Sequence, residues 1–106
     1  GTLFSDIYIL DFRKITYLYF ILKSIIENIK ILLLKAKEYL NSNEKEKALN
    51  IYDEVIKIEN ENLEAHFNKA LILTKLQKYK EALRSYDLAI EIKPDFEEAY
   101  INRGVI

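Results

Sequence analysis

The residues of this chain that could act in catalysis or metal binding stand apart from one another. His66 is the only histidine and there is no cysteine, so no second imidazole or thiolate can join it around a metal ion. Glu97 and Glu98 are adjacent, and adjacent side chains on a helix do not face each other, which favours a helix first turn over paired acid–base chemistry. No serine has a flanking nucleophile motif, and two glycines are too few for a phosphate-binding loop. The sequence therefore predicts no enzyme, cofactor or metal site, and a packing role for His66.

The charge balance argues against nucleic acid as a partner. The chain has 16 Lys and Arg residues against 17 Asp and Glu residues, so it has no basic excess with which to neutralise phosphates. Its most apolar stretch, residues 15–22, runs into Lys23 and falls well short of the ~20 residues that a membrane span needs. There is no signal-peptide pattern and no cysteine for disulfides, so we expect a cytoplasmic protein without a membrane span.

The chain repeats itself with a period of 34 residues. When residues 29–62 are laid over residues 63–96, eight pairs are identical, among them Ala36/Ala70, Ala48/Ala82, Tyr52/Tyr86 and Asp53/Asp87. Small residues allow two helices to approach closely, and each tyrosine lies four residues after an alanine on the same helix face. A unit built in this way buries that face only when the next unit is stacked on it.

The scarcity of glycine and proline predicts an all-α fold. The expected helices cover residues 29–41, 44–58, 62–75, 79–92 and 96–106. Asn43 and Asp95 are each followed three residues later by a glutamate, so both are expected to cap the helix that follows them. Pro94 is expected to end the helix before it, and Asn60 to serve a similar end one repeat earlier.

The segment from Tyr79 to Pro94, with the series Ala82, Tyr86 and Ala89, resembles the second helix of the tetratricopeptide repeat. The resemblance covers one unit at 29–62, a second at 63–96 and the first helix of a third at 97–106. It implies a right-handed α–α superhelix of antiparallel helix pairs, which binds a protein or peptide partner in a concave groove. The chain departs from the family at three kinds of position. The glycine usual between the helices is Asn43 or Gln77, and the leucine usual before the small residue is Lys35, Lys69 or Arg103. The large aromatic residue often found early in the first helix is replaced at that position by Leu32, His66 and Tyr100.

By this resemblance and the period, the groove is lined by the first helix of each unit. The three units contribute, in order, Lys30, Leu33, Lys37 and Leu40; Glu64, Phe67, Asn68, Leu71 and Lys75; and Glu98, Ile101 and Val105. Asn68 fits one position with which some family members clamp a C-terminal carboxylate, but Leu33 and Glu98 stand where cations are expected. An apolar or amphipathic segment is therefore the expected ligand. Phe67 and Leu71 are equally compatible with ligand contact and with burial against another helix of the chain.

Residues 1–28 do not follow the repeat, because Lys14 falls where a small residue should be. Apolar residues at helical spacing, from Ile15 to Ile29, predict a separate helix with Asp11 as its N-cap. Tyr17 and Phe20 make it apolar nearly all round, so it needs burial on more than one side. It could cap the solenoid, lie in the groove of its own or a neighbouring chain, or belong to a larger protein.

The sequence favours a non-enzymatic adaptor that self-associates, through the N-terminal helix or through the open third unit. One alternative is a membrane-surface or regulatory helical module that is anchored by the N-terminal helix. Another is a catalytic domain elsewhere in the full-length protein.

Overall fold

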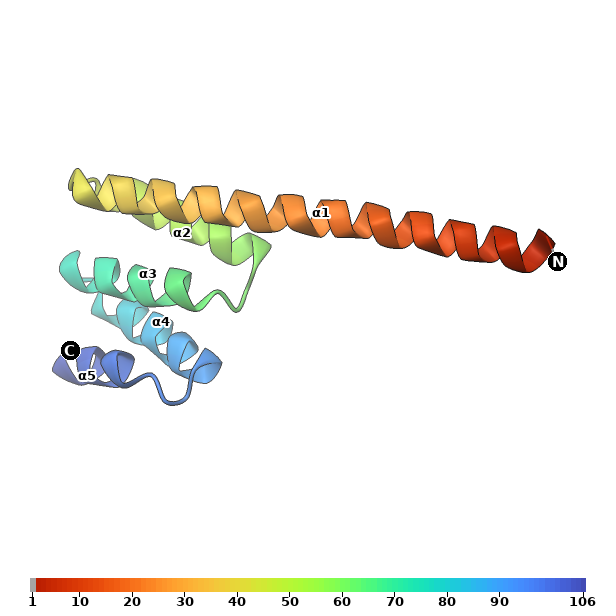
Figure 1. Ribbon diagram of the computed structural model, residues 1–106. Coiled ribbons are helices and arrows are strands. Elements are labelled where there is room, and N and C mark those ends of the chain that lie inside the picture. Colours follow the sequence, from red (N-terminus) through yellow and green to blue (C-terminus); the bar gives the residue numbers. More distant parts are fainter. Residues whose placement is uncertain (1) are drawn as a thin grey trace. The chain divides into compact units, whose positions relative to one another are not determined.

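A computed structural model describes the backbone of residues 2–106 and the side chains of residues 6 and 11–106. These residues form five helices and no strand, as Figure 1 shows: α1 (Thr2–Asn41), α2 (Lys45–Ile58), α3 (Leu63–Lys75), α4 (Tyr79–Ile92) and α5 (Glu97–Val105). The predicted all-α class is confirmed. The chain divides into two units, unit 1 up to Lys30 and unit 2 from Ile31 to Ile106, which are described separately.

Helix α1 is longer than the sequence suggested. It runs unbroken from Thr2 to Asn41, so it contains both the expected N-terminal helix and the first helix of the repeat. Asp11 lies inside this helix, and its expected role as an N-cap is wrong. The physical reason is the absence of glycine and proline between Thr2 and Asn41, since nothing there interrupts the hydrogen-bond ladder.

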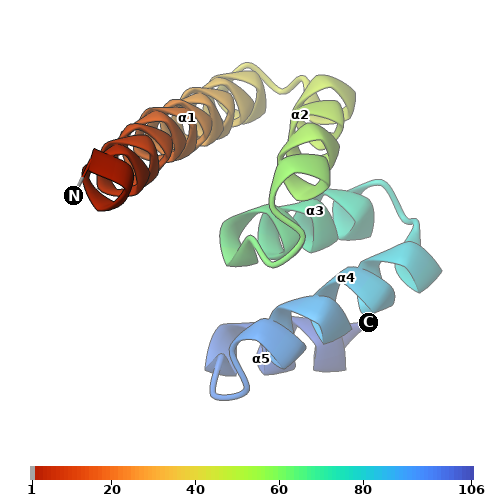
Figure 2. The ribbon, with the colours of Figure 1, turned by 90° about the vertical axis from the view of Figure 1, so that its right-hand side faces the viewer.

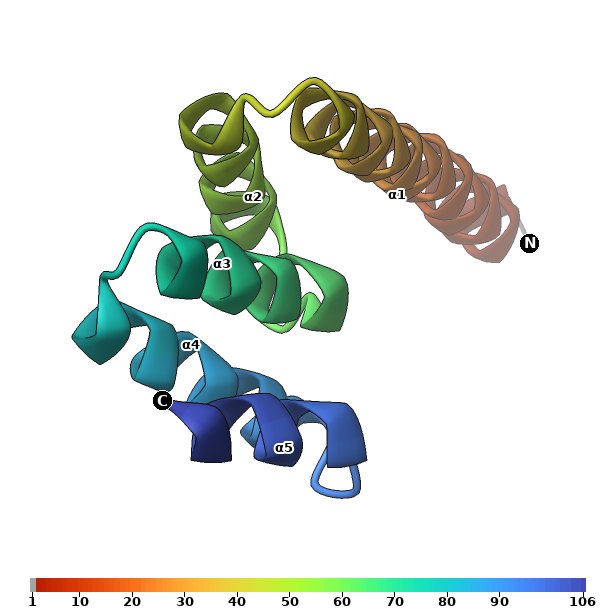
Figure 3. The same cartoon turned by 90° about the vertical axis from the view of Figure 1, so that its left-hand side faces the viewer.

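Unit 2 stacks its helices through alanines and tyrosines. Helix α2 packs on α3, α3 on α4, and α4 on α5 (Figures 2 and 3). Ala70, Tyr86 and Ala99 form one buried cluster that joins α3, α4 and α5, and each of the three is at most 1% exposed. The alanines that the repeat predicted at close helix contacts are fully buried: Ala36, Ala48, Ala70 and Ala82. Gly104 differs, because a Cβ built there would meet no atom of the described residues within 4 Å.

The loops between paired helices use left-handed residues instead of N-caps. Asn43 has a φ of 60° and Gln77, 34 residues later, a φ of 62°. The amide of Glu44 donates to the Tyr39 carbonyl at 2.8 Å, which makes Asn43 the left-handed residue of a Schellman motif at the end of α1. The expected N-cap at Asn43 is therefore wrong: Glu44 precedes α2, and its side chain makes no capping hydrogen bond.

The remaining helix ends give a mixed result. Pro94 stops α4 as predicted, since α4 ends at Ile92 and Lys93 is extended. Asp95 does not cap α5, whose N-cap position is Phe96. The described side-chain cap of unit 2 is Asn62, which accepts from the Ala65 amide at 2.9 Å.

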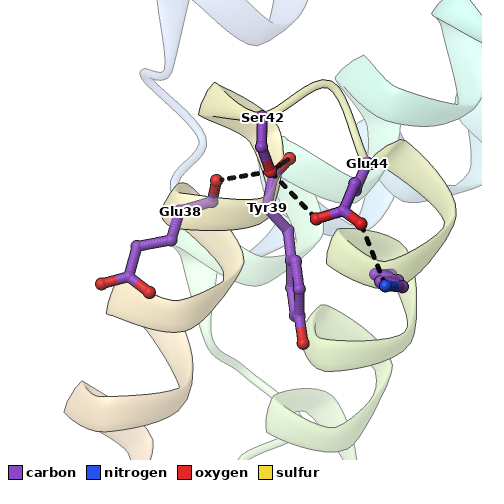
Figure 4. A network of polar contacts seen from close by, with 5 residues as sticks. Glu38, Tyr39, Ser42 and Glu44 are labelled. Carbon is purple, nitrogen blue, oxygen red and sulfur yellow. Dashed lines mark hydrogen bonds and ion pairs between the residues drawn. The ribbon is translucent and has the colours of Figure 1, made fainter.

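A small polar network covers the turn from α1 to α2 (Figure 4). The Ser42 hydroxyl lies 3.0 Å from Glu44 Oε2 and 3.1 Å from the Glu38 carbonyl oxygen, and Lys47 Nζ donates to Glu44 Oε1 at 2.9 Å. The hydrogen bond from Lys47, followed by that from Ser42, lowers the pKa of Glu44 below its usual value. The network links the last turn of α1 to the first turn of α2 by exposed, local hydrogen bonds.

Candidate peptide-binding groove

The predicted groove positions of unit 2 lie on the last part of α1, on α3 and on α5. Two of them, Lys37 of α1 and Glu64 of α3, form an ion pair with Nζ and Oε1 3.2 Å apart. Both side chains are more than a third exposed, so the pair contributes little to stability. It does neutralise the positive charge of Lys37. A ligand carboxylate would have to compete with Glu64 for Lys37.

Phe67 and Leu71 serve the packing of the chain itself. Both are half-buried and lie against the cluster of Ala70, Tyr86 and Ala99. The Phe67 ring centroid is 6.1 Å from that of Tyr86 and 4.7 Å from that of Phe96. Aromatic pairs at these distances add stability beyond the area they bury. Part of each side chain is therefore packed within the chain, and part is accessible.

The other predicted positions differ in exposure. Leu33 and Leu40 are half-buried, whereas Ile101 is 60% exposed and Lys75 is exposed, as are Glu98 and Val105. Asn68 is half-buried, and its Nδ2 donates to the Glu64 carbonyl of its own helix at 2.9 Å. Lys30 belongs to unit 1, where its Nζ lies 3.9 Å from Glu27.

His66 occupies a packing position. It is 5% exposed, and its Nε2 donates to the Asn60 carbonyl at 2.7 Å, which ties the loop before α3 to the helix. Within the described residues, no group of three or more His, Cys, Asp or Glu side chains comes together as a metal site would require. In the same part of the chain, no helix combines the length and the apolar character needed to cross a bilayer.

Two ion pairs between neighbouring repeats were not predicted. Lys69 of α3 lies 2.7 Å from Asp53 of α2, and Arg103 of α5 lies 2.6 Å from Asp87 of α4. The two pairs are one repeat apart in both members. They explain the departure from the family at these positions, because the basic residue that replaces leucine meets an aspartate of the preceding helix. The signal was available in the identical Asp53/Asp87 pair.

Comparison with known sequences decides the family. Two sequence models of the tetratricopeptide repeat match the chain, one over residues 29–62 and one over residues 63–96. The chain belongs to the tetratricopeptide repeat family. Among curated proteins, no sequence matches it.

Solved structures of tetratricopeptide domains share its fold. The TPR2AB domain of yeast Sti1, in a pHSP90 complex, matches with a TM-score of 0.70 and 33% identity over 74% of this chain and 31% of that one. The TPR2B domain of yeast Sti1, in a pHsp70 complex, matches with a TM-score of 0.68 and 32% identity over 73% of this chain and 62% of that one. The second TPR of Spaghetti, bound to an HSP90 peptide, is 23% identical with a TM-score of 0.69 over 73% of this chain and 71% of that one, and shows the fold alone. The predicted superhelix of tetratricopeptide units is therefore confirmed. This chain spans less than two thirds of the length of the two Sti1 domains.

Proposed function

We propose that this tetratricopeptide chain is a non-enzymatic scaffold that binds a peptide or helix of a partner protein along α1, α3 and α5. The observation that carries the proposal is a row of apolar side chains, Leu33, Phe67 and Ile101, which are 34 residues apart and each at least partly exposed. The complexes formed by the two similar Sti1 domains support the same kind of role. A row of this kind offers a ligand contacts from three successive helices.

The side chains around this row favour an apolar or amphipathic segment as the ligand. Lys37 is already paired with Glu64, and the exposed Glu98 repels a carboxylate. Asn68 uses an amide hydrogen on its own helix. A ligand that depends on a free C-terminal carboxylate would therefore lose most of its charged contacts, whereas apolar side chains would still find Leu33, Phe67 and Ile101.

The test is a selection of peptides displayed on phage against the whole chain, followed by calorimetric titration of the enriched peptides. Ile101→Glu is the informative variant, because Ile101 is 60% exposed and its loss should not disturb the core. Ile58→Glu is the matched control, since Ile58 is 48% exposed at the end of α2. We expect Ile101→Glu to weaken binding about tenfold or more, as for a central apolar contact. Equal affinities of the two variants, or enrichment only of peptides with acidic C-termini, would refute the groove.

Unit 1 supports a second candidate role, self-association through α1. Large apolar side chains on this stretch are well exposed, including Phe12 at 71%, Ile15 at 65%, Leu18 at 55% and Leu22 at 59%. Exposed apolar patches of this kind mark contact surfaces. The spacing of Ile15, Leu18 and Leu22 is that of a helix–helix seam.

Light scattering distinguishes self-association from the membrane-surface alternative. We expect a dimer or larger species at micromolar concentration and a monomer when residues 1–28 are deleted, with no co-sedimentation with vesicles of neutral and anionic phospholipids. A monomeric full chain that sediments with the vesicles through residues 1–28 would favour membrane anchoring instead.

A further inference from the structure

One side of α1 in unit 2 carries an uncovered surface. It consists of Ile31, Leu34, Lys35 and Glu38, here called the open stacking face, which line a hollow of about 330 Å³. Ile31 is 60% exposed and Leu34 62% exposed. The face borders the groove at Leu34, the repeat equivalent of the expected groove residue Asn68, whereas Ile31 and Leu33, two apart on the helix, point to different sides.

The repeat shows what covers the equivalent surface elsewhere in the chain. Adding 34 to each number gives Ala65, Asn68, Lys69 and Ile72 on α3, which packs on α2. There Ala65 is fully buried, Ile72 is 2% exposed and Lys69 pairs with Asp53 at 2.7 Å. The second helix of the preceding repeat thus covers this surface of α3.

The third repeat shows the same arrangement. Ala99 of α5 is fully buried in the cluster with Tyr86 of α4, and Arg103 pairs with Asp87 at 2.6 Å. In both cases the covering helix carries a tyrosine followed by an aspartate, and the aspartate meets the basic residue. The open stacking face therefore has two covered counterparts in the same chain.

Lys35 is the basic residue of the open stacking face and lacks such a partner. It makes no ion pair with the described residues, and its Nζ lies 6.0 Å from the centroid of the Tyr39 ring on its own helix. By its repeat position, Lys35 corresponds to Lys69 and Arg103, which both meet an aspartate. A helix placed as α2 is on α3 would bring a carboxylate to Lys35.

The second helices of this chain are already engaged. Helix α2 packs on α3, and α4 packs on both α3 and α5, so neither is free in another copy of the chain unless that copy comes apart. The second helices of another copy are therefore poor occupants. The charge on Lys35 calls for an acidic residue on the helix that covers this face.

We propose that the open stacking face binds an amphipathic helix of another protein, with an aspartate or glutamate opposite Lys35. The residue opposite Ile31 is small in that helix, because Ile31 takes the place of Ala99 and fills the space that Tyr86 occupies beside that alanine. The residue opposite Glu38 is basic or polar, since Glu38 stands where α3 has the buried Ile72. The inference does not depend on the groove.

The test uses a helix-stapled peptide with the sequence of residues 78–93, which contains α4, and the substitution Tyr86→Ala to make room for Ile31. Two-dimensional NMR of the whole chain locates the bound peptide, and fluorescence anisotropy gives its affinity. We expect saturable binding with shifts at Ile31, Leu34 and Lys35. Lys35→Glu should weaken binding about five- to tenfold, because one ion pair is lost and a repulsion is added. Lys57→Glu on α2 makes the same charge change away from the face and should leave the affinity unchanged.

A charge exchange completes the test. A peptide that also carries Asp87→Lys should bind the Lys35→Glu variant better than it binds the native chain. The proposal is overturned if no peptide binds at millimolar concentration, or if the shifts fall on Leu33 and Phe67 in the groove or on Ala99 and Arg103 of α5. A dimer of the native chain that Leu34→Ser converts to a monomer would also overturn it, because a second copy would then cover the face.

Discussion

Replacing Tyr52 with phenylalanine should change the pH dependence of stability more than stability itself. The Tyr52 side chain is fully buried, and its hydroxyl has no hydrogen-bond partner among the described residues. Burial, with a smaller contribution from the charge of Glu64, raises the pKa of Tyr52 to about 12 from an ordinary value of 10.0. At neutral pH, losing a hydroxyl without a partner should be nearly neutral or stabilising, by up to about 1 kcal/mol.

The loss of unfolding free energy at high pH follows from the linkage between proton binding and folding. Because the pKa is higher in the folded chain, the folded state keeps a proton that the unfolded state loses, and stability falls as pH rises from 10 toward 12. Between pH 9 and pH 11 this one group should cost the native chain about 1.3 kcal/mol relative to Tyr52→Phe.

Urea denaturation at a series of pH values measures this difference. Lysines also titrate in this range, but they do so in every variant, so the comparison between variants isolates Tyr52. Tyr79→Phe is the control, because it removes the same hydroxyl from a side chain that is 46% exposed. If the curves for Tyr52→Phe and the native chain stay parallel from pH 9 to pH 11, the burial argument for Tyr52 is wrong.

Three further predictions test the packing and the loops. Gln77→Gly should raise the unfolding free energy by about 0.5–1 kcal/mol, because a φ of 62° strains a residue with a side chain. Asn43→Gly should raise it less, because asparagine tolerates that conformation. A loss of stability with glycine at residue 77 would contradict this reasoning. A double-mutant cycle of Asp53→Ala and Lys69→Ala should give a coupling energy of about 0.5–1 kcal/mol that shrinks in 1 M salt; zero coupling would show that the pair does not act between repeats. Ala82→Leu should lower the unfolding free energy by about 2–3 kcal/mol, because Ala82 is fully buried, and an unchanged thermal midpoint would refute the close contact.

The sequence predicted the helix pairs well because their packing depends on residue size at fixed spacing. Ala36 and Ala70 had to be small and Tyr52 and Tyr86 had to fill the space beside them, and all four are at most 1% exposed. The ends of the helices were harder to predict. Asn43 fits an N-cap and a left-handed turn equally well by residue type, and the choice is made by the direction in which the chain must leave α1.

The residues expected to line a groove fall on the helices that the period predicted, but the contacts between them were not predicted. The period alone placed Lys37 and Glu64 on first helices, yet their pairing at 3.2 Å depends on how α1 and α3 lie side by side. The two ion pairs to Asp53 and Asp87 also depend on how two helices pack, and the recurrence of the aspartate after 34 residues was the one sign of them in the sequence. The unbroken α1 is a different kind of error: the lack of any breaker before Asn41 was visible, and the change of repeat register at residue 29 was mistaken for a helix boundary.

The cluster of Ala70, Tyr86 and Ala99 also bears on how such a chain can lengthen during evolution. In this cluster one tyrosine packs with an alanine of its own repeat and an alanine of the next. The residues one repeat earlier, Ala36, Tyr52 and Ala65, are of the same types and are also fully buried. A duplicated segment of residues 63–96 inserted after residue 96 would bring its own tyrosine and its own alanine. It could therefore form the same tyrosine–alanine contact with the repeat before it and with the repeat after it. Growth by whole repeats therefore needs no compensating mutation, whereas an insertion of any other length would place large residues where helices have to touch.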